Sequence, residues 1–122
     1  MKKYSKISLL WETFHFYSSE ISKQEEKHLK EIELLASSMS KTKNLQSETI
    51  KKQKRECLKT VDSLINLYRK QILCIHDLLD FHQSEEIPLE FEVDSKSLNF
   101  LENVTESLIS EMMLTRENLL FD

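Results

Sequence analysis

The chain carries two cysteines and four histidines, the residue types that bind metals or act as nucleophiles and bases. Cys74 and His76 are two residues apart and diverge by about 200° around a helix, so they cannot share one ion. His76 and Asp80 are four residues apart and lie on one face. A zinc site needs further ligands at recognisable spacing, and the sequence offers none. We therefore expect neither a metal centre nor a bound cofactor.

Covalent and acid–base catalysis also lack a recognisable pattern. No catalytic signature surrounds either cysteine, and Cys57 lies beside apolar residues, where a thiol usually serves as inert packing. The acid pairs Glu25–Glu26 and Glu85–Glu86 lie in polar stretches without the burial that raises a carboxyl pKa. The sequence has no glycine, so phosphate-binding loops and nucleophile elbows as usually built are excluded. These features predict a protein that is not an enzyme.

Charge is unevenly distributed along a chain whose net charge is −4. Residues 41–59 hold seven bases against two acids, whereas acids dominate from His76 onward. The cluster Lys51–Arg55 could contact phosphates or an acidic protein surface, but no aromatic residues are interleaved with it and the chain as a whole is acidic. We expect the partner to be another protein or a second copy of the chain, and we do not expect nucleic acid.

The apolar stretches and the cysteines of the sequence bear on the cellular compartment of the protein. No stretch approaches the ~20 consecutive apolar residues of a membrane span, and polar residues interrupt the first apolar run, which argues against a secretory signal. Cys57 and Cys74 fall in one predicted helix, about 25 Å apart, so they cannot form a disulfide within it. Free thiols fit a reducing compartment, and we expect a cytoplasmic protein.

Hydrophobic periodicity predicts an all-α fold. The absence of glycine and the single proline leave few sharp corners, and apolar residues recur at helical spacing in three segments. We expect helices at about residues 5–39, 47–83 and 95–120, in a single helical domain spanning 1–122. The middle segment has the strongest pattern, with two rows at coiled-coil spacing: Leu58, Ile65, Ile72 and Leu79 in one, and Val61, Tyr68, Ile75 and His82 in the other.

The first two helices could form a hairpin or one long rod. Their seven-residue rows slip by about one residue across Ser37–Ser47, a stretch rich in serine, threonine, asparagine and lysine. This slip favours an antiparallel hairpin that turns near Ser40–Ser47. The alternative is one long helix with a skip, which would imply an extended coiled-coil dimer. We predict a three-helix antiparallel bundle with coiled-coil character.

Two features could bind a partner. The aromatic residues Trp11, Phe14 and Tyr17 form a patch that a lone helix cannot bury. Residues 84–94 connect the last two helices, and within them apolar residues alternate with polar ones at the spacing of a strand. This extended strip could lie across the helices or pair with the sheet edge of another protein; its apolar residues are Ile87, Leu89, Phe91 and Val93.

The stretch Lys54–Lys70, with Ile75–His82 after it, resembles the helical part of the GrpE nucleotide-exchange co-chaperones. Leu101–Ile109 is similar to the later bundle helix of that family, so the likeness covers residues 54–109. The resemblance implies a helical dimer. In that family a glycine-bearing β domain contacts the Hsp70 partner, and the present sequence contains no glycine. The resemblance therefore does not carry over nucleotide exchange, and it assigns no functional residue.

Together these observations predict a non-catalytic interaction subunit or adaptor of a larger assembly, acting through amphipathic helices. Two alternatives remain open. The protein could be a small helical chaperone, either GrpE-like or shielding a client's apolar helix. It could also be an acidic inhibitor or regulator that occupies a partner's groove.

Overall fold

The computed structural model describes residues 2–42, 47–84 and 95–121. These residues form three α-helices: α1 (Lys2–Lys41), α2 (Glu48–Ser84) and α3 (Ser95–Phe121). The all-α prediction is confirmed, and the helix ends lie within a few residues of those expected. The predicted extended strip at 87–93, with Ile87, Leu89, Phe91 and Val93, lies outside the described residues. No described helix is both long enough and apolar enough to cross a membrane.

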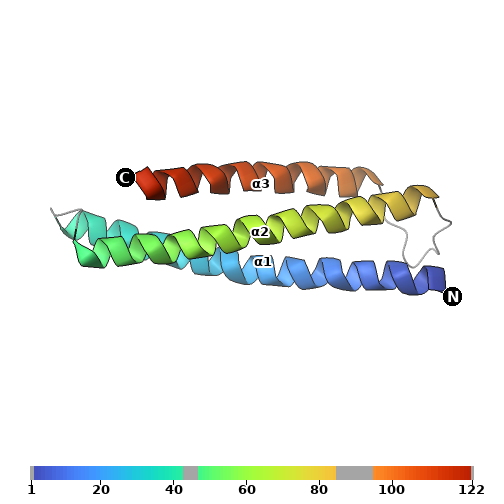
Figure 1. Ribbon diagram of the computed structural model, residues 1–122, viewed down its shortest axis with the longest axis horizontal. Coiled ribbons are helices and arrows are strands. Elements are labelled where there is room, and N and C mark those ends of the chain that lie inside the picture. Colours follow the sequence, from blue (N-terminus) through green and yellow to red (C-terminus); the bar gives the residue numbers. More distant parts are fainter. Residues whose placement is uncertain (1, 43–46, 85–94, 122) are drawn as a thin grey trace.

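The first two helices form an antiparallel hairpin, and α3 runs back along α2 in the direction of α1 (Figure 1). α2 lies between its two neighbours and packs extensively against both, while α1 and α3 contact each other far less. The slip in the apolar rows therefore marks a turn between helices, and the long-rod alternative is wrong. α1 ends at Lys41 and α2 begins at Glu48.

A serine cap starts α2. The backbone N–H of Ile50 donates to Ser47 Oγ at 3.3 Å, and the N–H of Lys51 donates to the Ser47 carbonyl at 3.0 Å. This satisfies donors that the first helical turn would otherwise leave unpaired. No described residue adopts positive φ.

The core follows α2 because α2 is covered from two sides. Cys57, Val61 and Ile75 are fully buried, whereas Leu58 and Ile72, which belong to the predicted row, are only half-buried. The most buried residues of α2 face the space between α1 and α3. The centre of the buried side of α2 is therefore shifted away from the predicted row of Leu58 and Ile72. Two clusters fill the ends of the bundle, one around Ile7, Ile75, Leu78 and Leu98 and the other around Leu35, Ile50 and Cys57.

Polar contacts between side chains of α2 and α1 set the register of the hairpin. Thr60 Oγ1 donates to Glu31 Oε1 at 2.5 Å, Tyr68 Oη donates to Glu25 Oε2 at 2.6 Å, and Gln71 Nε2 donates to Ser18 Oγ at 2.9 Å. The α1 partner moves towards the N-terminus as the α2 donor moves towards the C-terminus, as antiparallel pairing requires. A one-residue slip would separate every pair.

Candidate partner-binding furrow

The aromatic residues singled out from the sequence lie at the N-terminal end of α1. Trp11 and Phe14 are half-buried and pack against the cluster around Ile75 and Leu78. Their rings meet edge to face, with centroids 5.4 Å apart. The patch therefore finds much of its cover on α2 within the same chain. Whether these residues also bind a partner stays a prediction.

Tyr17 lies on a different side of α1 from Trp11. With Leu10 and Thr13 it lines a pocket of about 170 Å³ between α1 and α2, and Leu73 and Asp77 stand opposite on α2. Leu73 is 64% exposed. Ligand sites for small molecules usually enclose 300 Å³ or more, so this pocket fits one side chain of a partner better than a metabolite.

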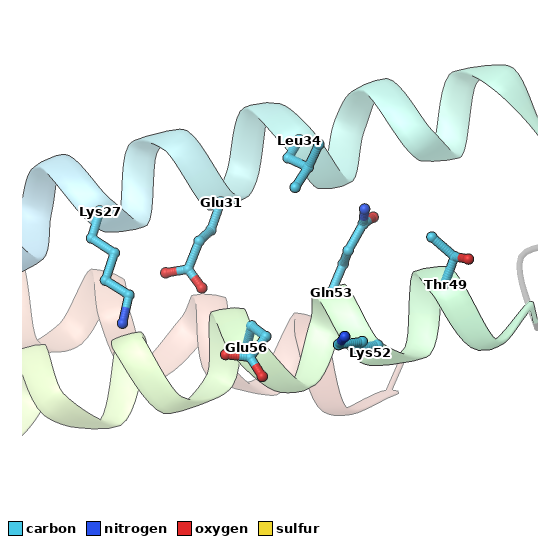
Figure 2. Close-up of a pocket in the computed structure, with 7 residues that line it drawn as sticks. All are labelled: Lys27, Glu31, Leu34, Thr49, Lys52, Gln53 and Glu56. Carbon is cyan, nitrogen blue, oxygen red and sulfur yellow. The ribbon is translucent and has the colours of Figure 1, made fainter.

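A larger groove lies between the same two helices nearer the turn. Its volume is about 480 Å³, and α3 passes behind α2 in the close-up (Figure 2). The groove combines two lysines, two glutamates and uncharged side chains. α1 contributes Lys27, Glu31 and Leu34, and α2 contributes Thr49, Lys52, Gln53 and Glu56.

The groove presents polar groups that the bundle leaves unmatched. Gln53 points towards α1 (Figure 2), and its Oε1 is buried without a hydrogen-bond partner among the described residues. Glu31 accepts from Thr60, and Glu56 lies 3.7 Å from Lys59 Nζ. No ion pair in the described part of the chain engages Lys27 or Lys52. A ligand that brings a donor and an anion would match these groups.

The pocket and the groove lie on one continuous side of the hairpin, which we call the α1–α2 furrow. Neither of them is lined by a residue of α3. Steps of three and four residues join their linings along each helix, and such steps keep a row on one side of a helix that packs against its neighbour. The row on α1 is Leu10, Thr13, Tyr17, Glu20, Gln24, Lys27, Glu31 and Leu34; on α2 it is Thr49, Gln53, Glu56, Thr60, Ser63, Leu67, Lys70, Cys74 and Asp77.

The titratable groups beside the furrow have packing roles. Burial raises the pKa of the Cys74 thiol to about 11, with a smaller contribution from Asp77, and its Sγ donates to the Leu10 carbonyl at 3.4 Å. Burial also raises the pKa of Cys57, with further contributions from Glu31 and Glu56. Both thiols are free and buried. A protonated, buried thiol is a poor nucleophile.

Two of the described histidines have shifted pKa values. His76 lies 2.8 Å from Glu102 of α3, and this contact raises its pKa. Burial lowers the pKa of His28. Among the described residues, no three His, Cys, Asp or Glu side chains converge in a way that could hold a metal ion.

Sequence reasoning missed the furrow because its residues do not share a chemical type. Pattern analysis selects apolar rows and charge runs, while the furrow mixes Leu34, Lys52 and Gln53 in a way that reads as ordinary surface. The alignment of two helices is what joins them. No family model matches the chain, and no curated protein or solved structure matches it significantly.

Proposed function

We propose that the protein is a non-catalytic interaction subunit whose α1–α2 furrow binds an amphipathic helix of another protein. The observation that supports this most directly is the pairing of a small, partly apolar pocket with a larger charged groove on one side of the hairpin. Helix-in-groove recognition uses this combination, with apolar anchors for affinity and charges for register. A bound helix would pack as a fourth member beside α1 and α2.

The furrow predicts the length of its partner. The pocket centres on Thr13 and the groove on Glu31, so the two lie about 27 Å apart along α1 at ~1.5 Å per residue. A straight helix needs about 18 residues to span that distance. The partner must therefore be a helix of roughly 20 residues or more, longer than most helices of globular proteins.

The furrow also predicts the chemistry of its partner. One large apolar side chain would enter the pocket between Tyr17 and Leu73, where burial is worth about 1.5–3 kcal/mol. An acidic side chain would approach Lys27 or Lys52 from the side away from Glu31 and Glu56, which lie between the two lysines (Figure 2). A donor such as an amide or hydroxyl would reach Gln53 Oε1, which otherwise stays unsatisfied at a cost of about 1–3 kcal/mol.

Photocrosslinking tests this placement. We would replace Leu73 in one variant and Lys52 in another with a benzophenone amino acid, irradiate native cells, and map the adducts by mass spectrometry. The expected result is that both positions label one partner, within one helix, at sites about 21 residues apart, because residues 52 and 73 lie that far apart along α2. The matched control is Leu29, an exposed leucine of α1 outside the furrow row, which should not label that helix.

Two results would count against the furrow. Equal labelling of the same protein from position 29 would show that contact is not confined to this side. Adducts from positions 73 and 52 that fall in unrelated proteins would show that no single helix spans it. As a second arm, Leu73→Asp should weaken binding of the mapped helix at least tenfold, and Leu29→Asp should leave it unchanged.

A further inference from the structure

The outer face of α3 is apolar at both ends and has no cover. Phe100 is 67% exposed and Leu114 is 59% exposed. They lie on the side of α3 opposite Leu98 and Thr105, which are buried against the bundle. Since α3 packs mainly on α2, nothing in the described part of the chain covers this outer side.

The pattern along this face is symmetric about its centre. Phe100 and Leu114 each lie seven residues from Ser107, and a charged residue stands beyond each of them. Lys96 precedes Phe100 by four residues and Glu117 follows Leu114 by three, which keeps both on the same face. All five side chains are exposed. These five residues follow the order base, apolar, small, apolar, acid, and the exposed polar residues Asn103 and Ser110 lie between them on the same face.

We propose that two copies of the chain associate through this face, with their α3 helices antiparallel and crossing at Ser107. A twofold interface places each residue opposite a partner whose number reflects through the centre. Phe100 of one copy then packs against Leu114 of the other, at both ends of the contact. The small Ser107 lies at the axis, where a large side chain would hold the helices apart.

Charge selects the antiparallel orientation. In this register Lys96 of each copy approaches Glu117 of the other, which gives two ion pairs per dimer. Parallel pairing would instead place lysine near lysine and glutamate near glutamate, and like charges at close range are destabilising. The same face thus favours one orientation and disfavours the alternative. This inference uses no residue of the α1–α2 furrow, so each proposal can fail without the other.

The area of this face sets the strength of the dimer. α3 has 27 residues, and at ~1.5 Å per residue it is about 40 Å long. One pair of helices of this length falls at or below the low end of stable interfaces, which bury roughly 1,200–2,000 Å² in total. We therefore expect a reversible dimer with a dissociation constant in the micromolar range or weaker.

Sedimentation equilibrium of the full chain between micromolar and millimolar concentration tests the association. The wild type should shift from monomer to dimer across this range. Leu114→Asp should weaken dimerisation at least tenfold, because each dimer would bury two aspartates against Phe100. Leu29→Asp, which changes an equally exposed leucine of α1, should dimerise like the wild type. Circular dichroism should report the same helix content for all three.

Charge reversal and cysteine crosslinking test the orientation. Lys96→Glu and Glu117→Lys should each weaken dimerisation about threefold to tenfold, and the double variant should restore it, because its pairs are reversed and complete. Ser107→Cys should form a disulfide dimer under mild oxidation, since its two copies meet at the axis. Ser22→Cys, an exposed position on α1, should not.

The proposal is overturned by a chain that stays monomeric at millimolar concentration. It is equally overturned by a dimer that Leu114→Asp leaves intact, or by a double charge variant that binds no better than the single ones. A Ser107→Cys dimer no more abundant than that of Ser22→Cys would exclude the crossing at Ser107.

Discussion

The contact between Tyr68 and Glu25 gives the sharpest test of how the hairpin is held in register. Tyr68 is buried, and its hydroxyl donates to the Glu25 carboxylate at 2.6 Å. Tyr68→Phe removes the hydroxyl and keeps the buried ring. A hydrogen bond to a charged group is worth about 1.5–3 kcal/mol. Glu25 is exposed and water can solvate it once the bond is lost, so we expect a cost of about 1.5 kcal/mol.

Urea and thermal unfolding would measure this cost. For a chain of this size, 1.5 kcal/mol corresponds to a fall in Tm of about 5–8 °C. A double-mutant cycle with Glu25→Ala separates the pair from helix propensity and packing, and its coupling energy should be about 1–1.5 kcal/mol. A coupling energy below about 0.3 kcal/mol would refute the idea that this bond fixes the register.

The pH dependence of folding stability gives an independent test of the contact between Tyr68 and Glu25. Burial, and after it the hydrogen bond to Glu25, raises the pKa of Tyr68 above its ordinary value of 10. The folded state therefore retains this proton, and its contribution to stability is complete below pH 10 and is lost as the pH rises further. Tyr68→Phe should remove this part of the loss of folding stability at alkaline pH. If the free energy of unfolding of Tyr68→Phe fell with pH above 10 as steeply as that of the wild type, the attribution of this loss to Tyr68 would be contradicted.

Three further predictions follow from the packing and from the titratable groups. Both thiols should resist alkylation in the native protein at pH 8, because burial raises the pKa of Cys57 and brings that of Cys74 to about 11; rapid native labelling, measured by mass spectrometry, would contradict this. NMR titration should give His76 a pKa above 6.5 because it bonds Glu102, and Glu102→Gln should lower it. The stability from this contact is then present below pH 6.5 and is lost as the pH rises; because His76 is exposed, the effect is small, and a pKa at or below 6.5 would refute the contact. Trp11→Ala should lower the free energy of unfolding by about 2 kcal/mol, since the ring packs on the core cluster; a change below about 0.5 kcal/mol in urea titrations would show that this packing contributes little.

Sequence periodicity was sufficient to predict the helices but not the centre of the core. The periodicity predicts that the row of Leu58 and Ile72 is part of the buried face, yet both residues are half-buried while Cys57 and Leu64 are fully covered. The difference arises because α2 has a neighbour on each side, so the residues between the two contacts are shielded from both. A single sequence does not state how many neighbours a helix has.

The polar contacts between helices were beyond sequence analysis for a related reason. Thr60 and Gln71 are buried, although neither residue type predicts burial. Their positions become intelligible only with Glu31 and Ser18, which lie 29 and 53 residues away along the chain. Long-range pairs of this kind are set by the register of the hairpin.

The sequence by itself determined the helical fold, its three segments and the place of the turn. These follow from local physics, because spacing, capping and the lack of glycine act within a few residues. The tertiary structure alone decided which side of the hairpin α3 covers. It thereby left the α1–α2 furrow and the outer face of α3 open, because a surface between two helices exists only after both are packed together.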